Sequence, residues 1–212
     1  MKRIAILGGV CLLVSMALAG SAPALSTGHA LSTEAAMKAG ANARALALVG
    51  NPQAFRVLKA PASTCAGADD PSAPISVQET AMKCLVNYAR QQAGLPRLAD
   101  TRKLNVSALN KSTDILRCNR FSHEACGRDF LFWFRRAGYI GAGCWWAGEN
   151  LAWGSGPLGS ARSIMKAWLR SASHRANILA SDYSEFGLSL RVGSLSGSDD
   201  AHVWVNHFGR HC

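Results

Sequence analysis

The chain has 212 residues, of which 49% are hydrophobic and 17% charged, and its formal net charge is +10 at pH 7. This length suits one domain with a real core. The Lys and Arg residues are scattered and form no run, which argues against a dedicated nucleic-acid groove. A basic surface attracts anions such as wall polymers or acidic lipid headgroups. An equally favoured alternative is that the positive charge only keeps the protein soluble.

The first segment, 1–24, is predicted to be a secretory signal peptide. Lys2 and Arg3 form a basic start, residues 4–20 are almost wholly apolar, and residues 22–24 suit a signal peptidase. Loss of this segment lowers the 23 basic residues to 21 against 13 acidic residues, a net charge of +8. We expect a secreted, extracellular protein that is not a membrane protein after signal removal.

The chain has seven cysteines, and six are left once the predicted signal peptide, which contains Cys11, is removed. An even number of cysteines in an exported chain predicts disulfides, here three. Six cysteines allow 15 pairings, and the sequence does not choose among them. No C-x2-C spacing occurs, so a zinc finger is disfavoured. The pairing that we expect is Cys65 with Cys84, Cys118 with Cys126, and Cys144 with Cys212.

Residues 25–74 are predicted to be an Ala-rich leader or spacer, weakly ordered, and the compact domain is then 75–212. The leader contains neither Trp nor Tyr. Residues 34–49 suit a loose helix, which Gly50-Asn51-Pro52 ends. A turn-rich stretch over 67–74 marks the second boundary.

Helical spacing of apolar residues predicts four helices in the compact domain. They run from Ile75 to Ala93, from about Asp100 to about Cys118, from Phe130 to Ala137, and onward from a capping Ser160. His123 follows the second helix, where a loop can aim its ring inward. Ser173 is expected to cap a short turn that starts at His174, and Gly148-Glu149-Asn150 is expected to lie in a loop.

The last part of the chain changes period. Apolar residues alternate with polar ones over 186–192 and again over 203–208, and a polar stretch lies between them. This pattern is typical of an antiparallel hairpin with one buried face. Four helices followed by a hairpin predict an α+β layered fold.

Several ordered motifs together resemble one family. Residues 148–152 (GENLA), 168–179 (WLRSASHRANIL), 185–187 (EFG) and 204–208 (WVNHF) closely resemble the bacterial branch of the CAP superfamily. This superfamily comprises the cysteine-rich secretory, antigen 5 and pathogenesis-related 1 proteins, and its domain is also called SCP. The resemblance covers roughly Ile75 to Gly209 and implies an α-β-α sandwich with a central antiparallel sheet flanked by helices.

The resemblance also implies a central cleft that holds two histidines and two glutamates. His123 corresponds to the first histidine, Glu149 to the glutamate of the GEN motif, and His174 to the second histidine. The second glutamate of the eukaryotic pattern lies three residues after the tryptophan, where Ser171 stands instead. The candidate catalytic residues are therefore His123, Glu149, His174 and Ser171.

His123 and His174 are the candidate metal ligands, for Zn2+ or another divalent metal bound weakly, with Glu149 orienting a water molecule or acting as a base. The alternative is that these residues serve folding alone. A structural role is expected for Arg175 and Asn177. The tryptophans are expected in the core or the cleft wall, and His202, His207 and His211 are less favoured as extra ligands.

Two functions follow from these patterns. One is a secreted binding protein for a lipid, a sterol or a wall-derived anionic cell-envelope ligand. The other is a metal-assisted hydrolase, a protease or nuclease, that uses His123, Glu149 and His174. Binding is favoured because the carboxylate pair expected of acid/base chemistry is incomplete. A Ser171–His174 dyad is a separate alternative, disfavoured because it lacks a defined oxyanion hole.

Overall fold

The computed structural model describes residues 4–12 and 33–212. The rest of the predicted signal peptide and leader, 1–3 and 13–32, lies outside the described residues. The helices are α1 (Thr33–Gly50), α2 (Phe55–Leu58), α3 (Ile75–Gln92), α4 (Arg102–Arg117), η1 (Ala125–Gly127), α5 (Phe132–Arg136), η2 (Gly156–Gly159), α6 (Ala161–Arg170) and α7 (Ala172–Leu179). The strands are β1 (Ile4–Leu12), β2 (Ala99–Asp100), β3 (Trp145–Ser155), β4 (Glu185–Leu195) and β5 (Ser198–His211).

A single five-stranded sheet forms the centre of the molecule, in the order β1-β3-β5-β4-β2. The pairs β1–β3, β3–β5 and β4–β5 are antiparallel, and only the two-residue strand β2 pairs in parallel, with β4. The predicted α+β fold with a largely antiparallel sheet is confirmed. The short parallel edge strand, which makes the sheet mixed, is an addition to that prediction.

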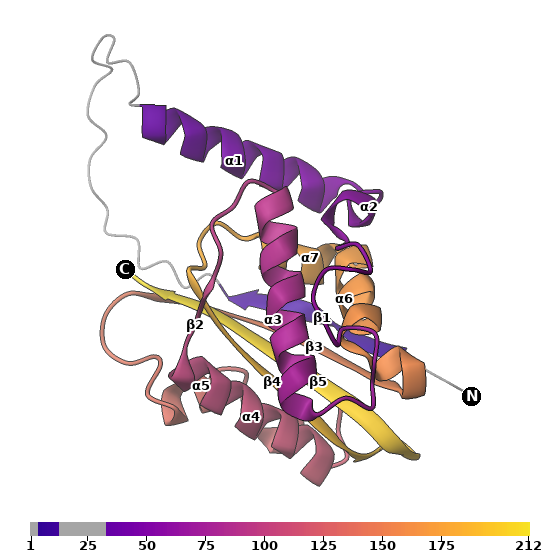
Figure 1. Cartoon of the computed structure of the whole chain (residues 1–212). Coiled ribbons are helices and arrows are strands. Elements are labelled where there is room, and N and C mark those ends of the chain that lie inside the picture. Colours follow the sequence, from indigo (N-terminus) through magenta and orange to yellow (C-terminus); the bar gives the residue numbers. More distant parts are fainter. Residues whose placement is uncertain (1–3, 13–32) are drawn as a thin grey trace.

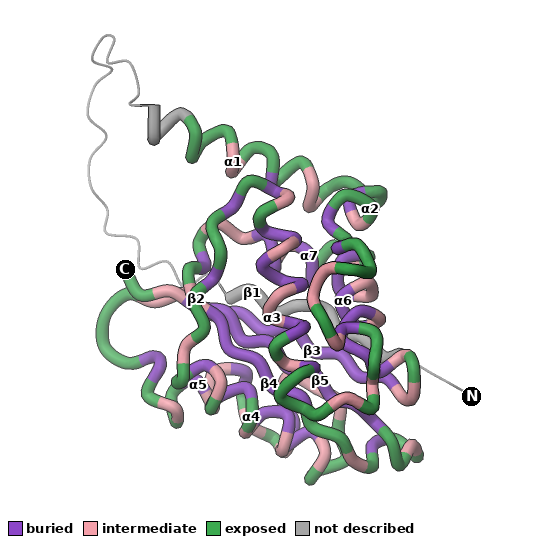
Figure 2. The backbone as a smooth tube through the Cα atoms, in the orientation of Figure 1, coloured by how far each residue is buried: buried purple, intermediate pink, exposed green. Residues whose placement is uncertain are grey.

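Helices cover both faces of the sheet (Figure 1). Helices α3, α6 and α7 share one apolar cluster with alternate residues of the strands, such as Ala152 and Trp204. Helix α4 packs on the other face with the intervening residues, such as Leu151 and Val205. This division follows from strand geometry, because successive side chains point to opposite faces. Figure 2 shows β3, β4 and β5 buried along most of their length between the two layers.

The closest approach between a helix and the sheet occurs at Gly187 of β4. A Cβ atom at this position would overlap the backbone of Leu104 and Asn105 in α4. The side chain of Asn105 also accepts a hydrogen bond from the Leu188 N–H at 2.8 Å. The small residue of the EFG motif therefore lets α4 lie directly on β4.

The three disulfides agree with the expected pairing. Cys65 is bonded to Cys84, Cys118 to Cys126, and Cys144 to Cys212. The first bond ties the segment before α3 to α3, the second closes the loop after α4, and the third joins the start of β3 to the end of the chain.

The segment before α3 contributes to the core. Helix α1 confirms the predicted helix over 34–49 and its end near Gly50, and Ala45, Ala54 and Leu58 are buried in the same cluster as α3 and α6. Residues 4–12 of the predicted signal peptide form β1 beside β3. The boundaries after residues 24 and 74 stay predictions. Within the described ranges, none of the helices is sufficiently long and apolar to cross a membrane.

Two local predictions are wrong. Glu149 and its neighbours lie in strand β3, not in a loop. Glycines made this stretch look like a loop, but Gly148 and Gly154 admit the Tyr183 ring and the backbone of Leu158 respectively. Helix α7 begins at Ala172 with Ser171 at its N-cap position, so Ser173 lies inside the helix.

Candidate functional site

The GEN strand places Glu149 against α4. Its side chain points to the same face as Leu151 and Trp153, which pack against α4. The β3–β5 register sets Glu149 directly opposite His207. The carboxyl group is fully buried, so its charge requires partners at close range.

Two histidines supply these partners. Nδ1 of His123 lies 2.5 Å from Oε1 of Glu149, and Nε2 of His207 lies 2.7 Å from Oε2. The other nitrogen of His207 lies 2.9 Å from the Ser107 hydroxyl, and its ring stacks on Phe134 with the centroids 4.2 Å apart. The structure thus brings two of the predicted residues together and adds His207 to them.

Lys111 completes this buried group. Its Nζ lies 3.9 Å from Oε1 of Glu149 and donates a hydrogen bond to the carbonyl oxygen of His123. Burial raises the pKa of Glu149, but hydrogen bonds from His123 and His207 and the charge of Lys111 outweigh burial and lower it to about 2. Burial lowers the pKa values of His207 and Lys111, although contact with Glu149 opposes the change. Glu149 is therefore a fixed anion above strongly acidic pH.

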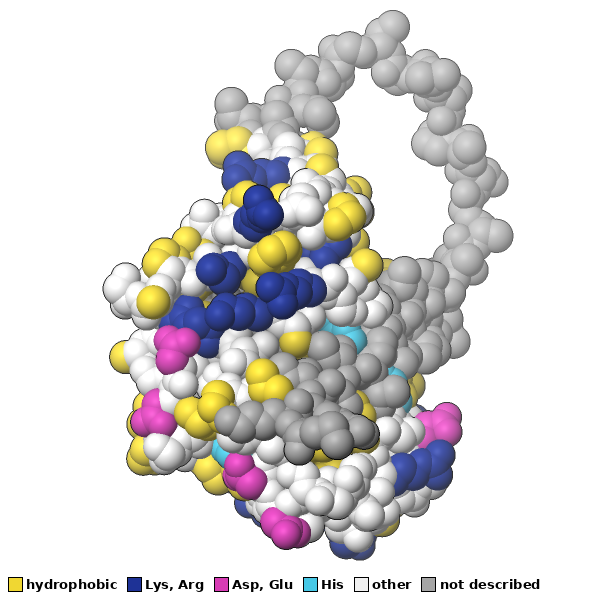
Figure 3. Space-filling model, turned by 90° about the vertical axis from the view of Figure 1, so that its right-hand side faces the viewer, with side chains coloured by type: hydrophobic (Ala, Val, Ile, Leu, Met, Phe, Trp, Pro, Cys, Tyr) yellow, Lys and Arg dark blue, Asp and Glu magenta, His cyan; other side chains and the backbone are white. Residues whose placement is uncertain are grey.

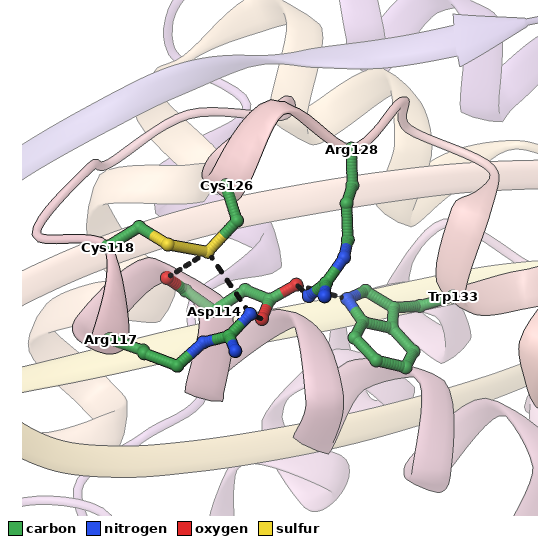
Figure 4. The surroundings of a disulfide bond; sticks show 6 residues. All are labelled: Asp114, Arg117, Cys118, Cys126, Arg128 and Trp133. Carbon is green, nitrogen blue, oxygen red and sulfur yellow. Dashed lines mark hydrogen bonds and ion pairs between the residues drawn. A yellow bond between two sulfur atoms is a disulfide. The ribbon is translucent and has the colours of Figure 1, made fainter.

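The loop that carries His123 is fastened at both ends. The Cys118–Cys126 bond closes it, and Asp114 of α4 anchors the segment that follows (Figure 4). The buried Asp114 carboxylate accepts hydrogen bonds from Arg128 and, at 2.7 Å, from the Trp133 indole N–H. The position of His123, predicted just past a helix end, is confirmed and has this covalent and ionic support.

His174 and Ser171 form a separate pair on the other side of the sheet. Nδ1 of His174 lies 2.7 Å from the Ser171 hydroxyl. Helix α7 is held to β3 by Asn150, which donates to the His174 carbonyl oxygen at 3.0 Å. Because Asn150 and Glu149 are successive residues of one strand, α7 and the His123 loop lie on opposite faces of it.

This arrangement bears on the predicted metal ligands. His123 hydrogen-bonds to Glu149 on one face of β3, whereas His174 hydrogen-bonds to Ser171 on the other. Among the side chains that the structure describes, residues 37–212, no group of three or more His, Cys, Asp or Glu is arranged to hold a metal ion. Metal binding by His123 and His174 stays a prediction.

Arg175 and Asn177 hold α7 in place, as the sequence predicts. Asn177 donates to the carbonyl oxygen of Glu149 at 3.2 Å and to the side-chain oxygen of Asn150 at 2.9 Å. The guanidinium group of Arg175 donates to the carbonyl oxygens of Leu48 and Val49 at 3.1 and 2.5 Å. These carbonyls lie in the last turn of α1, so Arg175 supplies the partners that a helix C-terminus otherwise lacks.

A cavity of about 570 Å³ lies between α1 and α7. Most of its lining is apolar and comes from both helices, and Asn177 links its wall to the GEN strand. Five of the eleven lining residues are polar, and Asp182 is the acid among them. The lining residues are Asn42, Ala45, Leu46, Val49, Ser173, Ala176, Asn177, Leu179, Ala180, Ser181 and Asp182.

Sequence reasoning did not identify two parts of this site. The sequence disfavours His207 as a ligand. The alternation over 203–208 nevertheless predicts that its side chain points to the same side of the strand as Val203 and Val205. The missing step was the assignment of Glu149 to a strand, because only the β3–β5 register sets the two side chains opposite each other. Lys111 lies on an ordinary amphipathic helix, and no local signal distinguishes it from a surface lysine.

Comparison with known proteins gives consistent matches. Residues 84–208 match the model of the CAP, or cysteine-rich secretory protein, family. The uncharacterized protein YkwD of Bacillus subtilis (strain 168) is 33% identical over 153 residues, which are 71% of this chain and 54% of that protein. This chain thus spans about half the length of that curated relative.

Two solved structures share the fold. An extracellular protein of Bacillus anthracis that contains an SCP domain has a TM-score of 0.52 and 24% identity, covering 64% of this chain and 41% of that one. An outer surface protein of Borrelia burgdorferi has a TM-score of 0.52 and 19% identity, covering 62% and 90%. At these identities the likeness concerns the fold alone.

Proposed function

The chain belongs to the cysteine-rich secretory protein (CAP) family, and we propose that it acts outside the cell as a binding protein for an apolar ligand. The three disulfides support an oxidising location, as does the relative from Bacillus anthracis, which is an extracellular protein. The ligand class is one that offers an extended apolar part and a polar end, such as a fatty acid.

The cavity between α1 and α7 carries this proposal. Its volume of about 570 Å³ lies within the range of about 300–1,000 Å³ that is usual for ligand sites. Ala45, Val49 and Leu179 supply apolar wall, and Asn42 and Ser181 are uncharged hydrogen-bonding groups that suit the polar end of an amphipathic ligand. Transfer of apolar ligand surface into such a cavity contributes about 25 cal/mol for each Å² removed from water.

The state of Glu149 argues for binding over hydrolysis. A general base works best when its pKa lies near the working pH, whereas the hydrogen bonds and nearby positive charge lower the pKa of Glu149 to about 2. Both of its carboxylate oxygens already accept hydrogen bonds, from His123 and His207. Such a group suits the stabilisation of β3 and α4 better than proton transfer to a substrate.

A fluorescence titration of the full chain with cis-parinaric acid tests the proposal. Ala176 lines the cavity, and the Ala176→Trp variant is expected to fill it and weaken binding at least tenfold. Ala172 lies on the same helix, is exposed and is outside the cavity lining, so Ala172→Trp is the matched control and should bind like the wild type. Absence of saturable binding by the wild type, or equal weakening by both variants, would contradict the proposal.

Glu149→Gln separates the two functions. The variant is expected to retain binding of the fatty acid, because Glu149 points away from α7 and the cavity. Hydrolysis of peptide or nucleic-acid substrates that the wild type performs and this folded variant lacks would instead favour the hydrolase.

A further inference from the structure

Five cationic side chains gather on the surface formed by the end of α1, by α2 and by α6. Four of them are exposed and one is half-buried. Figure 3 shows this gathering of Lys and Arg side chains on the face that lies at the right of Figure 1. We call this surface the cationic face; its members are Arg44, Arg56, Lys59, Lys166 and Arg170.

Helices α2 and α6, which carry or flank four of these residues, are in contact, and α1 is joined to α7. Arg170, at the end of α6, lies over the ring of Phe55 in α2, with its guanidinium carbon 4.9 Å from the ring centroid. The end of α1 is fixed by Arg175, which bonds to the carbonyl oxygens of its last turn. The cations are therefore presented on an ordered surface.

The charge of the cationic face is not neutralised within the part of the chain that the structure describes. None of its five members takes part in an ion pair there. The acid at its border, Asp69, pairs instead with the buried guanidinium group of Arg162 at 2.8 Å. Mutual repulsion of unpaired cations is relieved when an anionic partner binds.

An exposed apolar side chain lies beside two of these cations. Val57 stands between Arg56 and Lys59 in sequence, on the same short helix as Arg56, and is 51% exposed. A soluble polyanion would meet the cations alone and leave this apolar group in water. A bilayer offers both an anionic headgroup layer and an apolar layer beneath it.

We propose that the cationic face docks the protein reversibly on an anionic lipid bilayer. Arg44, Arg56 and Lys59 of this face lie outside the residues 84–208 that match the family, whereas Lys166 and Arg170 lie within them. The inference goes beyond the proposed function, because docking requires neither an occupied cavity nor Glu149. If both proposals hold, the bilayer supplies the apolar ligand that binds in the cavity between α1 and α7.

Vesicle cosedimentation of the full chain tests the proposal. Vesicles of phosphatidylcholine with phosphatidylglycerol are compared with vesicles of phosphatidylcholine alone, at low and at physiological salt. The wild type is expected to bind only the anionic vesicles, less tightly as salt rises. The double variant Arg56→Gln/Lys59→Gln should bind them roughly 30-fold more weakly, because each cation near such a surface contributes roughly fivefold.

Matched control variants show whether a change in vesicle binding comes from the cationic face or only from a change in net charge or surface hydrophobicity. Arg102 and Lys103 are an adjacent, exposed pair on α4 at the opposite face of the sheet, and Arg102→Gln/Lys103→Gln should change binding less than threefold. Val57→Ser should weaken binding to anionic vesicles, whereas Val106→Ser on α4 should not.

Three results would overturn the proposal. The first is equal binding to neutral and anionic vesicles, and the second is equal weakening by the two double variants. The third is equally tight binding to soluble inorganic polyphosphate with no effect of Val57→Ser, which would assign the face to a polyanion. Fatty-acid titration of Arg56→Gln/Lys59→Gln reports separately on the cavity, so failure of docking and failure of ligand binding are distinguishable.

Discussion

Replacement of Glu149 by Gln should remove the contribution that the ionised Glu149 carboxylate makes to the free energy of unfolding. This contribution depends on pH. Hydrogen bonds from His123 and His207, together with the charge of Lys111, lower the Glu149 pKa from 4.5 to about 2. At 1.36 kcal/mol for each unit, the ionised carboxylate contributes about 3 kcal/mol to the free energy of unfolding. Because the folded pKa is the lower one, this contribution is complete above about pH 5 and is lost as pH falls towards 2.

The assay is urea-induced unfolding of the wild type and of Glu149→Gln between pH 6 and pH 3. The difference in unfolding free energy between the two proteins should shrink by about 2 kcal/mol over this range, because most of the pKa shift has been titrated by pH 3. Glu124 is exposed on the same loop, and Glu124→Gln should follow the wild-type profile. Parallel profiles for the wild type and Glu149→Gln would refute the assigned network.

Three further perturbations test the frame around the site. Gly187→Ala should lower stability by about 1–3 kcal/mol or more, because the added methyl group overlaps the α4 backbone, whereas Gly141→Ala, with open space around it, should leave the melting temperature nearly unchanged. Cys144→Ser/Cys212→Ser should cost about 4 kcal/mol in urea unfolding, because the bond spans 68 residues; a loss below about 1 kcal/mol would contradict this. Arg175→Leu should speed tryptic cleavage within 33–50 roughly tenfold, because the last carbonyls of α1 lose their partners, and an unchanged cleavage rate would mean that other contacts hold α1.

Features set by local sequence were predicted well. Ser160 caps α6 by accepting a hydrogen bond from the Ser163 N–H, as its position before an apolar stripe predicts. The hairpin of β4 and β5 follows from alternation over 186–208. His123 lies after α4 as expected, because the helix period and the nearby cysteines both limit where that helix ends.

Features that depend on strand register were not predicted. The composition of Gly148-Glu149-Asn150 is typical of a loop, and only the neighbouring strands make it β3. The placement of His174 across the sheet from Glu149 follows from that strand, because Asn150 and not Glu149 faces α7. The cavity likewise depends on α1, whose docking onto α7 through Arg175 has no signal in either segment alone.

The most direct test of the proposed function is native mass spectrometry of the protein purified from the medium of its own host. We expect the wild type and Ala172→Trp to carry a noncovalent adduct that organic extraction identifies as a fatty acid or related amphipathic lipid. Ala176→Trp, which fills the cavity between α1 and α7, should lack the adduct. An adduct that persists in Ala176→Trp, or wild-type protein from which extraction recovers no apolar molecule, would contradict the account.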